Sequence, residues 1–342
     1  MEPTAAREGA HRAAADRAAA VGDGCDAPEA DGLAAGGDFG AAAHAALFYA
    51  AIGDYLRVTG GFVIEGLRAG AAVMVAVPLM RAEALREFLG PDADTVAFAD
   101  MSSLGRNPAR IIPAVRAFAD SRPGQLVRYV GEPSWRSRSG PEQDEVVRHE
   151  ALVTMAFAGM PVRVLCAYNT AGLDPAMLAG AERTHQVLMR GGSWEPSPSY
   201  PGDGAGHGAQ SPLPPPPAEA PVLTYREDPA AARAFAREQA RAAGLREPRL
   251  TDLVIAVGEL AANTLRHTKG TGTVRVWLAS GEIICEMSDS GHIRDALAGQ
   301  RFPAADAGGG HGLWVVNQVC DLVEMRTGSS GTTFRLHIAL RG

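Results

Sequence analysis

The stretch Leu250–His267, LTDLVIAVGELAANTLRH, decides the fold of the C-terminal part of the chain. Wound as an α-helix, at about 100° per residue, it carries its apolar side chains along a single arc. That arc consists of Leu253, Val254, Val257, Leu260, Ala261 and Leu265. The opposite side consists of Asp252, Glu259, Asn263 and Arg266. We therefore predict a helix with one face on a core, and a polar face that by itself is typical of solvent-exposed surface.

Three glycine-containing motifs follow this helix in order. Asp289-Ser290-Gly291 closes the predicted strand 283–288, the glycine-rich segment 308–312 opens a predicted helix, and Gly331-Thr332-Thr333 starts the last predicted strand. Each motif alone is as typical of an ordinary turn or glycine loop. An acid and an amide on one helix, then an Asp at a strand end, then a glycine-rich turn, together predict a magnesium–nucleotide site.

The long helix supplies a metal ligand and an acid. Mg²⁺ prefers oxygen ligands and keeps several waters, so the side-chain oxygen of Asn263 can serve together with phosphates. Glu259 lies one turn earlier, where its carboxylate can orient or deprotonate an attacking hydroxyl. The presence of the acid, and not the amide alone, favours a kinase.

The later motifs supply contacts to the nucleotide. The Asp289 carboxylate can accept a hydrogen bond from the exocyclic amine of adenine, and Gly291 lets the backbone approach the base. The backbone amides of Gly310, His311 and Gly312 stand ahead of a helix, where they form a ready phosphate site. The sequence thus predicts an adenine nucleotide held with Mg²⁺.

Composition divides the chain into four zones. Residues 1–42 form an Ala/Gly-rich tail with almost no large apolar side chains, which we expect to be disordered. Residues 43–190 and 221–342 are structured domains, and 191–220 is a linker dense in Pro, Gly and Ser. In 43–190, strands are expected at 45–49, 72–77, 95–99, 126–130 and 162–167. Helices are expected between them at 53–68, 81–89, 108–119 and 142–158.

This alternation predicts a parallel sheet covered by helices in the first domain. No G-x-x-x-x-G-K-[ST] motif occurs, so a Walker-type phosphate loop is not supported. The second domain is expected to be an α/β sandwich with a largely antiparallel sheet. Its helices are predicted at 229–243 and 248–267, with a short one ending at 320. Its strands are predicted as two hairpins, 273–279 with 283–288 and 321–326 with 332–340.

Bulk properties narrow the functional class. The net charge of −7 argues against direct nucleic-acid binding and against an anionic membrane surface. The four cysteines form no C-x-x-C pair, and Cys166, Cys285 and Cys320 lie in apolar runs typical of buried free thiols. With no signal peptide and no membrane-spanning apolar window, we expect a cytoplasmic protein.

The motifs E-L-A-A-N, D-S-G, G-G-H-G-L-W and G-T-T resemble those of the Bergerat-fold ATPases, the superfamily of gyrase, chaperone and histidine-kinase ATPase domains. Within it, this chain looks most like the anti-sigma factor serine kinases of the RsbW/SpoIIAB type. The resemblance implies ATP and Mg²⁺ as cofactors. It implies that Glu259 is the general base towards a protein serine, Asn263 holds Mg²⁺, Asp289 reads adenine, Gly310 and Gly312 contact phosphates, and Thr333 lies near the adenine pocket. One departure is His292-Ile293, where a second glycine often follows the D-x-G motif.

Four segments of the first domain, 44–49, 66–70, 131–135 and 149–152, look like parts of the MEDS sensory domain. That domain is thought to sense small molecules on a RecA-like fold without the phosphate loop, in agreement with the predicted parallel sheet. The residues we select as a sensory pocket are His44, Tyr49, Trp135, His149 and Glu150. The competing interpretation is that they are structural. No ligand spacing supports a metal site built from His44 and His149.

The combination of the two domains resembles the RsbA-family anti-sigma regulators. It implies transcription regulation through a sigma factor and a STAS-type antagonist protein, control by an unknown small-molecule ligand, and a homodimer. Two alternatives stay open. One is a histidine kinase with His149 as phosphoacceptor, although Gly159 and Pro161 end its helix soon after. The other is a non-catalytic switch in which ATP occupancy sets partner affinity.

Overall fold

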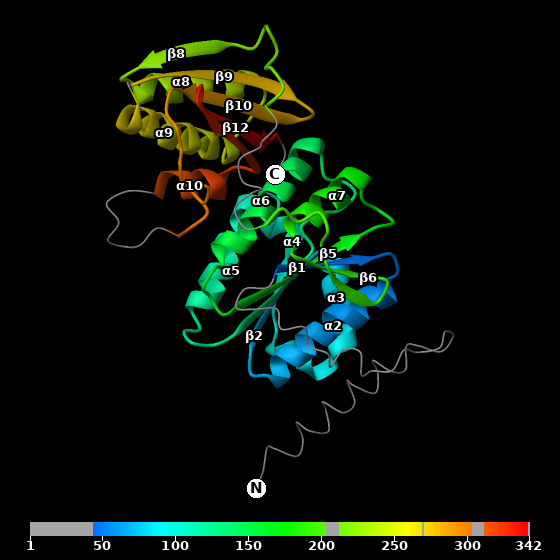
Figure 1. Ribbon diagram of the computed structural model, residues 1–342. Helices are drawn as coiled ribbons and strands as arrows, with labels where there is room; N and C mark the ends of the chain where they lie inside the picture. Colours follow the sequence, from blue (N-terminus) through cyan, green and yellow to red (C-terminus); the bar gives the residue numbers. More distant parts are fainter. Residues whose placement is uncertain (1–43, 203–211, 269, 303–310, 341–342) are drawn as a thin grey trace. The chain divides into compact units, whose positions relative to one another are not determined.

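The computed structural model describes residues 44–202, 212–268, 270–302 and 311–340 (Figure 1). The tail predicted at 1–42 lies outside the described residues. The described residues form two compact units, one around each of two β-sheets. Each unit is described by itself.

The first sheet has seven strands in the order β3-β2-β4-β5-β1-β6-β7. Their bounds are β1 His44–Tyr49, β2 Ala72–Val77, β3 Ala97–Asp100, β4 Val127–Gly131, β5 Val162–Asn169, β6 Val187–Arg190 and β7 Ser193–Pro196. All neighbouring pairs are parallel except β6 and β7, which form an antiparallel hairpin. The predicted parallel sheet is confirmed, and its five predicted strands are present with ends shifted by at most two residues.

Helices connect the strands of this sheet. They are α2 Ile52–Arg68, α3 Leu79–Leu89, α4 Met101–Leu104, α5 Ile111–Asp120, α6 Gly140–Ala156 and α7 Pro175–Thr184, with 3₁₀ turns at Gly90–Thr95 and Pro108–Arg110. α2 and α3 bury Val63 and Leu85 against Val75 of β2. Burying each such side chain contributes roughly 1.5–3 kcal/mol. The four predicted helices correspond to α2, α3, α5 and α6 and are confirmed, whereas α4 and α7 were not predicted.

Strands β6 and β7 were also not predicted. They pair across Gly191 and Gly192, whose φ angles of 58° and 88° favour glycine. β7 thus lies inside the range 191–220 that composition assigns to the linker. The alternation of Trp194 with polar neighbours is too short a pattern to stand out against the Pro- and Gly-rich sequence after it.

The second sheet has five strands in the order β11-β12-β10-β9-β8, with every neighbouring pair antiparallel. The strands are β8 Val222–Arg226, β9 Thr271–Ala279, β10 Glu282–Asp289, β11 Leu322–Gly328 and β12 Gly331–Ala339. The helices are α8 Pro229–Ala242, α9 Arg249–His267 and α10 His311–Val319. Both predicted hairpins are confirmed, and β8 is an additional edge strand.

Helix α9 is the centre of the second core. Its Leu253, Val257, Leu260 and Ala261 are buried against sheet residues such as Cys285, as the apolar arc predicts. α8 packs beside it through three alanines, Ala232, Ala236 and Ala240, spaced one helical turn apart. Small side chains allow the two helices to lie close together, so the alanine-rich composition is used structurally here.

Cys166, Cys285 and Cys320 are buried free thiols, as predicted. Burial raises the pKa of the Cys285 thiol to about 12, which keeps it protonated. Within the described ranges, no helix is both long and apolar enough to cross a lipid bilayer.

Candidate nucleotide site

A cavity of about 780 Å³ opens beside α9, the end of β10 and the start of α10. This volume is typical of a site for a nucleotide-sized ligand. Its apolar walls come from Leu260, Met287, Ile293, Leu297, Leu313 and Phe334. Its polar groups include Asn263, Thr264, Asp289 and Thr332. The cavity therefore combines an apolar slot with a few polar groups, as an adenine base requires.

Asp289 is held rigidly in this cavity. Its Oδ1 accepts a hydrogen bond from the backbone N–H of Gly291 at 2.7 Å, and its Oδ2 lies 2.7 Å from the hydroxyl of Thr264. An ionised carboxylate has about four acceptor positions, so two remain for an exocyclic amine. A Cβ at Gly331, whose φ is 124°, would collide with the Asp289 carbonyl oxygen. The first residue of the G-T-T motif must therefore be glycine for β12 to pass close to the backbone of Asp289.

A second hydrogen bond extends this arrangement to the edge of the sheet. The Tyr225 hydroxyl on β8 donates to the Thr264 hydroxyl at 3.0 Å. Burial raises the pKa of Tyr225, and the nearby Asp289 charge raises it further, so the phenol stays a donor. Sequence reasoning selected neither Tyr225 nor Thr264, although Thr264 directly follows Asn263.

Glu259 and Asn263 both face Gly312 in α10. A Cβ at Gly312 would come within 2.8 Å of Glu259 Oε2 and 3.4 Å of Asn263 Nδ2. A side chain at this position would displace the end of the Glu259 side chain, whereas its distance to the Asn263 amide is that of ordinary van der Waals contact. Both side chains are half-buried and not fully exposed. The polar face of α9 is therefore part of a site and not only solvent-exposed surface.

The remaining residues predicted for the nucleotide, His311 and Gly310 for the phosphates and Thr333 for the adenine, are placed unevenly. Gly310 lies outside the described residues, and His311 is the exposed first residue of α10. Thr333 is not among the cavity-lining residues, although its hydroxyl lies 2.9 Å from that of Ser288, which does line the cavity. Strand alternation puts its neighbour Thr332 in the cavity wall instead. Thr332 lines the cavity, and the predicted place of Thr333 near an adenine pocket stays a prediction.

The segment after Asp289 is held by the β11–β12 hairpin. The backbone N–H of Ile293 donates to Thr327 Oγ1 at 3.0 Å, and the Thr332 hydroxyl donates to the Gly291 carbonyl at 2.8 Å. His292 also contacts Thr327. Side-chain hydroxyls of the hairpin thus fix a segment in which related motifs often carry a second glycine.

The residues fit ATP and Mg²⁺. The close approach at Gly312 is a cradle that a Cβ would fill, and the Asn263 oxygen is a ligand type that Mg²⁺ prefers. Asp289 and the apolar slot suit the base, and the N-terminus of α10 suits phosphates. The fold and the cavity together are those expected of a nucleotide-binding domain.

Comparison with known families agrees with this class. Residues 225–338 match the histidine kinase-like ATPase domain. Residues 43–186 match the MEDS domain, described as the methanogen/methylotroph DcmR sensory domain. The chain therefore carries a MEDS sensory domain followed by a histidine kinase-like ATPase domain, and both resemblances stated from the motifs are confirmed.

Comparison with individual proteins adds little. A search of curated proteins finds no match. The crystal structure of the RsbU and RsbW domains of Rv1364c from Mycobacterium tuberculosis is 24% identical, with a TM-score of 0.25. The similarity covers 34% of this chain and 32% of that chain. The chain therefore spans about a third of that solved chain.

The five residues predicted as a sensory pocket do not share one place. His44 and Tyr49 are the two ends of β1, which at about 3.3 Å per residue separates them by roughly 16 Å. The Tyr49 hydroxyl donates to Glu132 at 2.7 Å and accepts from Arg81 at 3.2 Å. The Arg138 guanidinium lies over the Trp135 ring, with its Cζ 3.8 Å from the centre of that ring.

Tyr49 lines a cavity of about 680 Å³ at the carboxyl ends of β1, β5 and β6. Ligands of parallel α/β sheets commonly bind at this edge. Burial raises the pKa of Glu132, although the hydrogen bond from Tyr49 and the charge of Arg81 lower it. His149 and Glu150 are consecutive buried residues of α6, with Glu150 near His44. The selected residues thus belong to more than one site.

Proposed function

We propose that the chain is a cytoplasmic, ATP-dependent protein serine kinase that regulates a sigma factor. In this proposal it binds the sigma factor and phosphorylates a serine of a STAS-type antagonist protein, and a small-molecule ligand of the MEDS domain controls it. The observation that carries the kinase part is the approach of Gly312 to both Glu259 and Asn263. It puts an acid and a metal ligand together at the helix N-terminus that suits the phosphates.

Each residue has a role in the proposed transfer. Asp289 and the apolar slot hold the adenine, while Asn263 would hold Mg²⁺, which supplies charge neutralisation at the phosphates. Glu259 accepts the proton of the attacking serine hydroxyl as its oxygen bonds to the γ-phosphorus and the bond to the β-phosphate oxygen breaks. Catalysis in such transfers consists mainly of positioning and charge stabilisation.

The histidine-kinase alternative has less support. His149 is only 4% exposed and lies in α6, which ends at Ala156. A buried imidazole cannot reach a γ-phosphate without unfolding its surroundings. The fate of the phosphoryl group decides between the alternatives, because phosphohistidine is labile in acid and phosphoserine is not.

The test is transfer from labelled ATP to purified candidate antagonist proteins. We expect acid-stable label on a serine, and a Glu259→Gln protein should transfer roughly 10²–10⁴-fold more slowly with ATP affinity nearly unchanged. Glu238→Gln, the same chemical change at an exposed position of α8, is the matched control. Equal transfer by the Glu259→Gln protein would refute the base role.

Two further outcomes would assign another function. Tight ATP binding with no transfer to any partner would indicate the non-catalytic switch. Acid-labile label on the chain itself would indicate a histidine kinase. Capture of a sigma factor from cell extract in an ATP-dependent manner tests the partner part of the proposal separately.

A further inference from the structure

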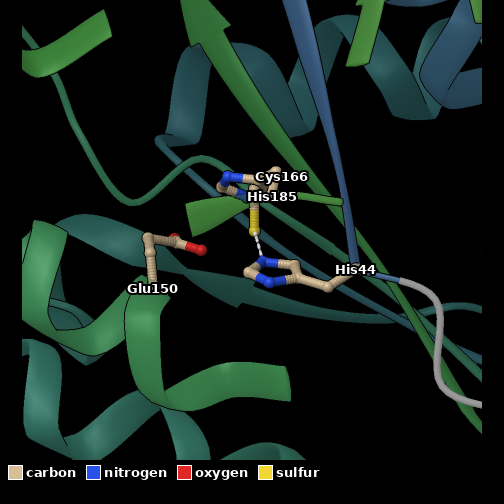
Figure 2. Close-up of side chains that lie close together, drawn as sticks. All are labelled: His44, Glu150, Cys166 and His185. Carbon is tan, nitrogen blue, oxygen red and sulfur yellow. Dashed lines mark hydrogen bonds between the residues drawn. The ribbon is translucent and has the colours of Figure 1, made fainter. Parts of the chain in front are cut away.

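A second cluster of polar side chains lies in the MEDS domain, apart from the Tyr49 cavity. His44, Glu150, Cys166 and His185 each bring one ligand atom to within 4.8 Å of the others (Figure 2). All four residues are at most 2% exposed. These are donor types that bind transition metals, gathered at a site shielded from solvent.

The topology of the sheet creates this cluster. His44 begins β1, and its second neighbour Ala46 pairs in parallel with Cys166 of β5, so His44 and Cys166 share one sheet face. His185 is the residue after α7, two positions before Val187, which pairs with Ala45 of β1. It therefore reaches the same end of β1 as His44.

The distances are close to those of a metal site. His44 Nε2 and Cys166 Sγ are 3.5 Å apart, and the two imidazole rings have centres 3.9 Å apart. A tetrahedral ion with bonds of about 2.0–2.3 Å separates its ligand atoms by roughly 3.3–3.8 Å. The pair His44–Cys166 already fits, and the widest separation must close by about 1 Å.

Outer hydrogen bonds orient both imidazoles. His185 Nδ1 lies 2.7 Å from the Ala181 carbonyl oxygen, which can only accept, so Nδ1 donates this hydrogen bond and Nε2 is the nitrogen that we assign to the ion. His44 Nδ1 lies 3.4 Å from the Thr154 hydroxyl, with Nε2 turned to Cys166. Metal-binding histidines characteristically use one nitrogen for the ion and the other for such a partner.

We propose that Cys166, His44, His185 and Glu150 bind one divalent transition-metal ion of the zinc class. The thiol of Cys166 loses its proton to solvent as the metal–sulfur bond forms, and the two imidazoles bind as neutral ligands through Nε2. The thiolate and the Glu150 carboxylate together balance the charge of the ion, which a buried site requires. This site is independent of the ATP site and of the proposed kinase activity.

The test is titration of the metal-free full-length chain with Co²⁺, followed by absorbance. We expect one equivalent of Co²⁺ to give a near-ultraviolet thiolate-to-cobalt band with the visible bands of a tetrahedral site, and Zn²⁺ to displace it. Cys166→Ser should lose the thiolate band while retaining ATP binding. Cys320→Ser removes a buried thiol of the ATPase domain, and Cys25→Ser one outside the described residues. Both controls should retain the band.

A second variant covers the case in which Cys166→Ser does not fold. Glu150→Gln keeps the sulfur and should keep the thiolate band, with Co²⁺ affinity at least about tenfold weaker. Absence of any band in the wild-type chain would overturn the proposal. Persistence of the band in Cys166→Ser, or unchanged Co²⁺ affinity in Glu150→Gln, would also overturn it.

Discussion

The two domains bury polar side chains in different ways. In the ATPase domain, His337 on β12 lies between two carboxylates, with Nδ1 3.1 Å from Glu282 and Nε2 2.9 Å from Glu324. In the MEDS domain, two imidazoles lie with one thiol and one carboxylate. The first arrangement suits a single added proton, whereas the second has donors enough for a divalent ion. The comparison shows that the kinds and numbers of side chains in a buried cluster indicate whether it can hold a proton or a metal ion.

The cavity of the ATPase domain differs most from these two clusters. Its carboxylate, Asp289, is expected to accept a hydrogen bond from the exocyclic amine of adenine and to hold no proton or metal ion. An Asp289→Asn substitution puts an amide where the carboxylate accepts hydrogen bonds from Gly291 and Thr264. Loss of a charged hydrogen bond in this setting costs about 3 kcal/mol, or roughly a hundredfold in ATP affinity. Isothermal titration with ATP and Mg²⁺ measures it.

Asp295 provides the control for this prediction. It also lines the cavity, but its side chain is 54% exposed and pairs with Arg301. Asp295→Asn should change ATP affinity by less than about threefold, since exposed pairs contribute little. Similar losses of ATP affinity from both substitutions would show that the loss does not come from a specific contact between Asp289 and the base.

The cluster of His337 with Glu282 and Glu324 should make the free energy of unfolding depend on pH. Burial lowers the pKa of His337, but its hydrogen bonds and the charges of Glu282 and Glu324 outweigh this and raise it from 6.5 to about 8. The stabilisation is therefore fully present below pH 6.5 and is lost as the pH rises through about 8. It amounts to about 2 kcal/mol. Urea unfolding at pH 6 and pH 9 should show this decrease in the wild type.

A His337→Gln variant isolates the contribution of the imidazole. Its free energy of unfolding should fall less between the two pH values, by about the same 2 kcal/mol. Equal pH dependence in both proteins would mean that the imidazole is already neutral at pH 6. The comparison between the two clusters would then fail.

The smallest effect is expected at Gly312. An alanine there brings its Cβ to 2.8 Å from Glu259 Oε2, and the carboxylate end must move by a few tenths of an ångström. We expect ATP affinity with Mg²⁺ to fall about tenfold, or 1.4 kcal/mol. Gly328→Ala, where a Cβ meets nothing within 4 Å, is the matched control. An unchanged ATP affinity in Gly312→Ala would show that the positions of Glu259 and Asn263 near Gly312 do not matter for nucleotide binding.

The sequence indicated more of the residues around the cavity of the ATPase domain than of the MEDS cluster. Asn263, Asp289 and Gly312 stand in short motifs whose residue types already state their chemistry. Cys166 and His185 stand in no such motif. They meet His44 only because crossovers place β5 and β6 on either side of β1. β6 was not predicted, so His185 had no assigned position.

The register of β12 against β10 is a second feature that the sequence does not determine. The choice between Thr332 and Thr333 depends on which face of β12 each side chain occupies, and Asp289 pairs with Thr332. A shift of one residue exchanges the two faces. The motif G-T-T contains both threonines, and only the pairing with β10 distinguishes them.

The hydrogen bond from Tyr225 gives the ATPase domain a reciprocal coupling. β8 is the strand with which the chain enters this domain, and Tyr225 connects it through Thr264 to Asp289. A displacement of β8 would remove the Tyr225 hydroxyl from Thr264, the residue that holds the Asp289 carboxylate. Thermodynamic linkage then requires the converse, so that an adenine bound to Asp289 strengthens the docking of β8. If Asp289 binds adenine as proposed, the position of the edge strand and the affinity for the nucleotide depend on each other.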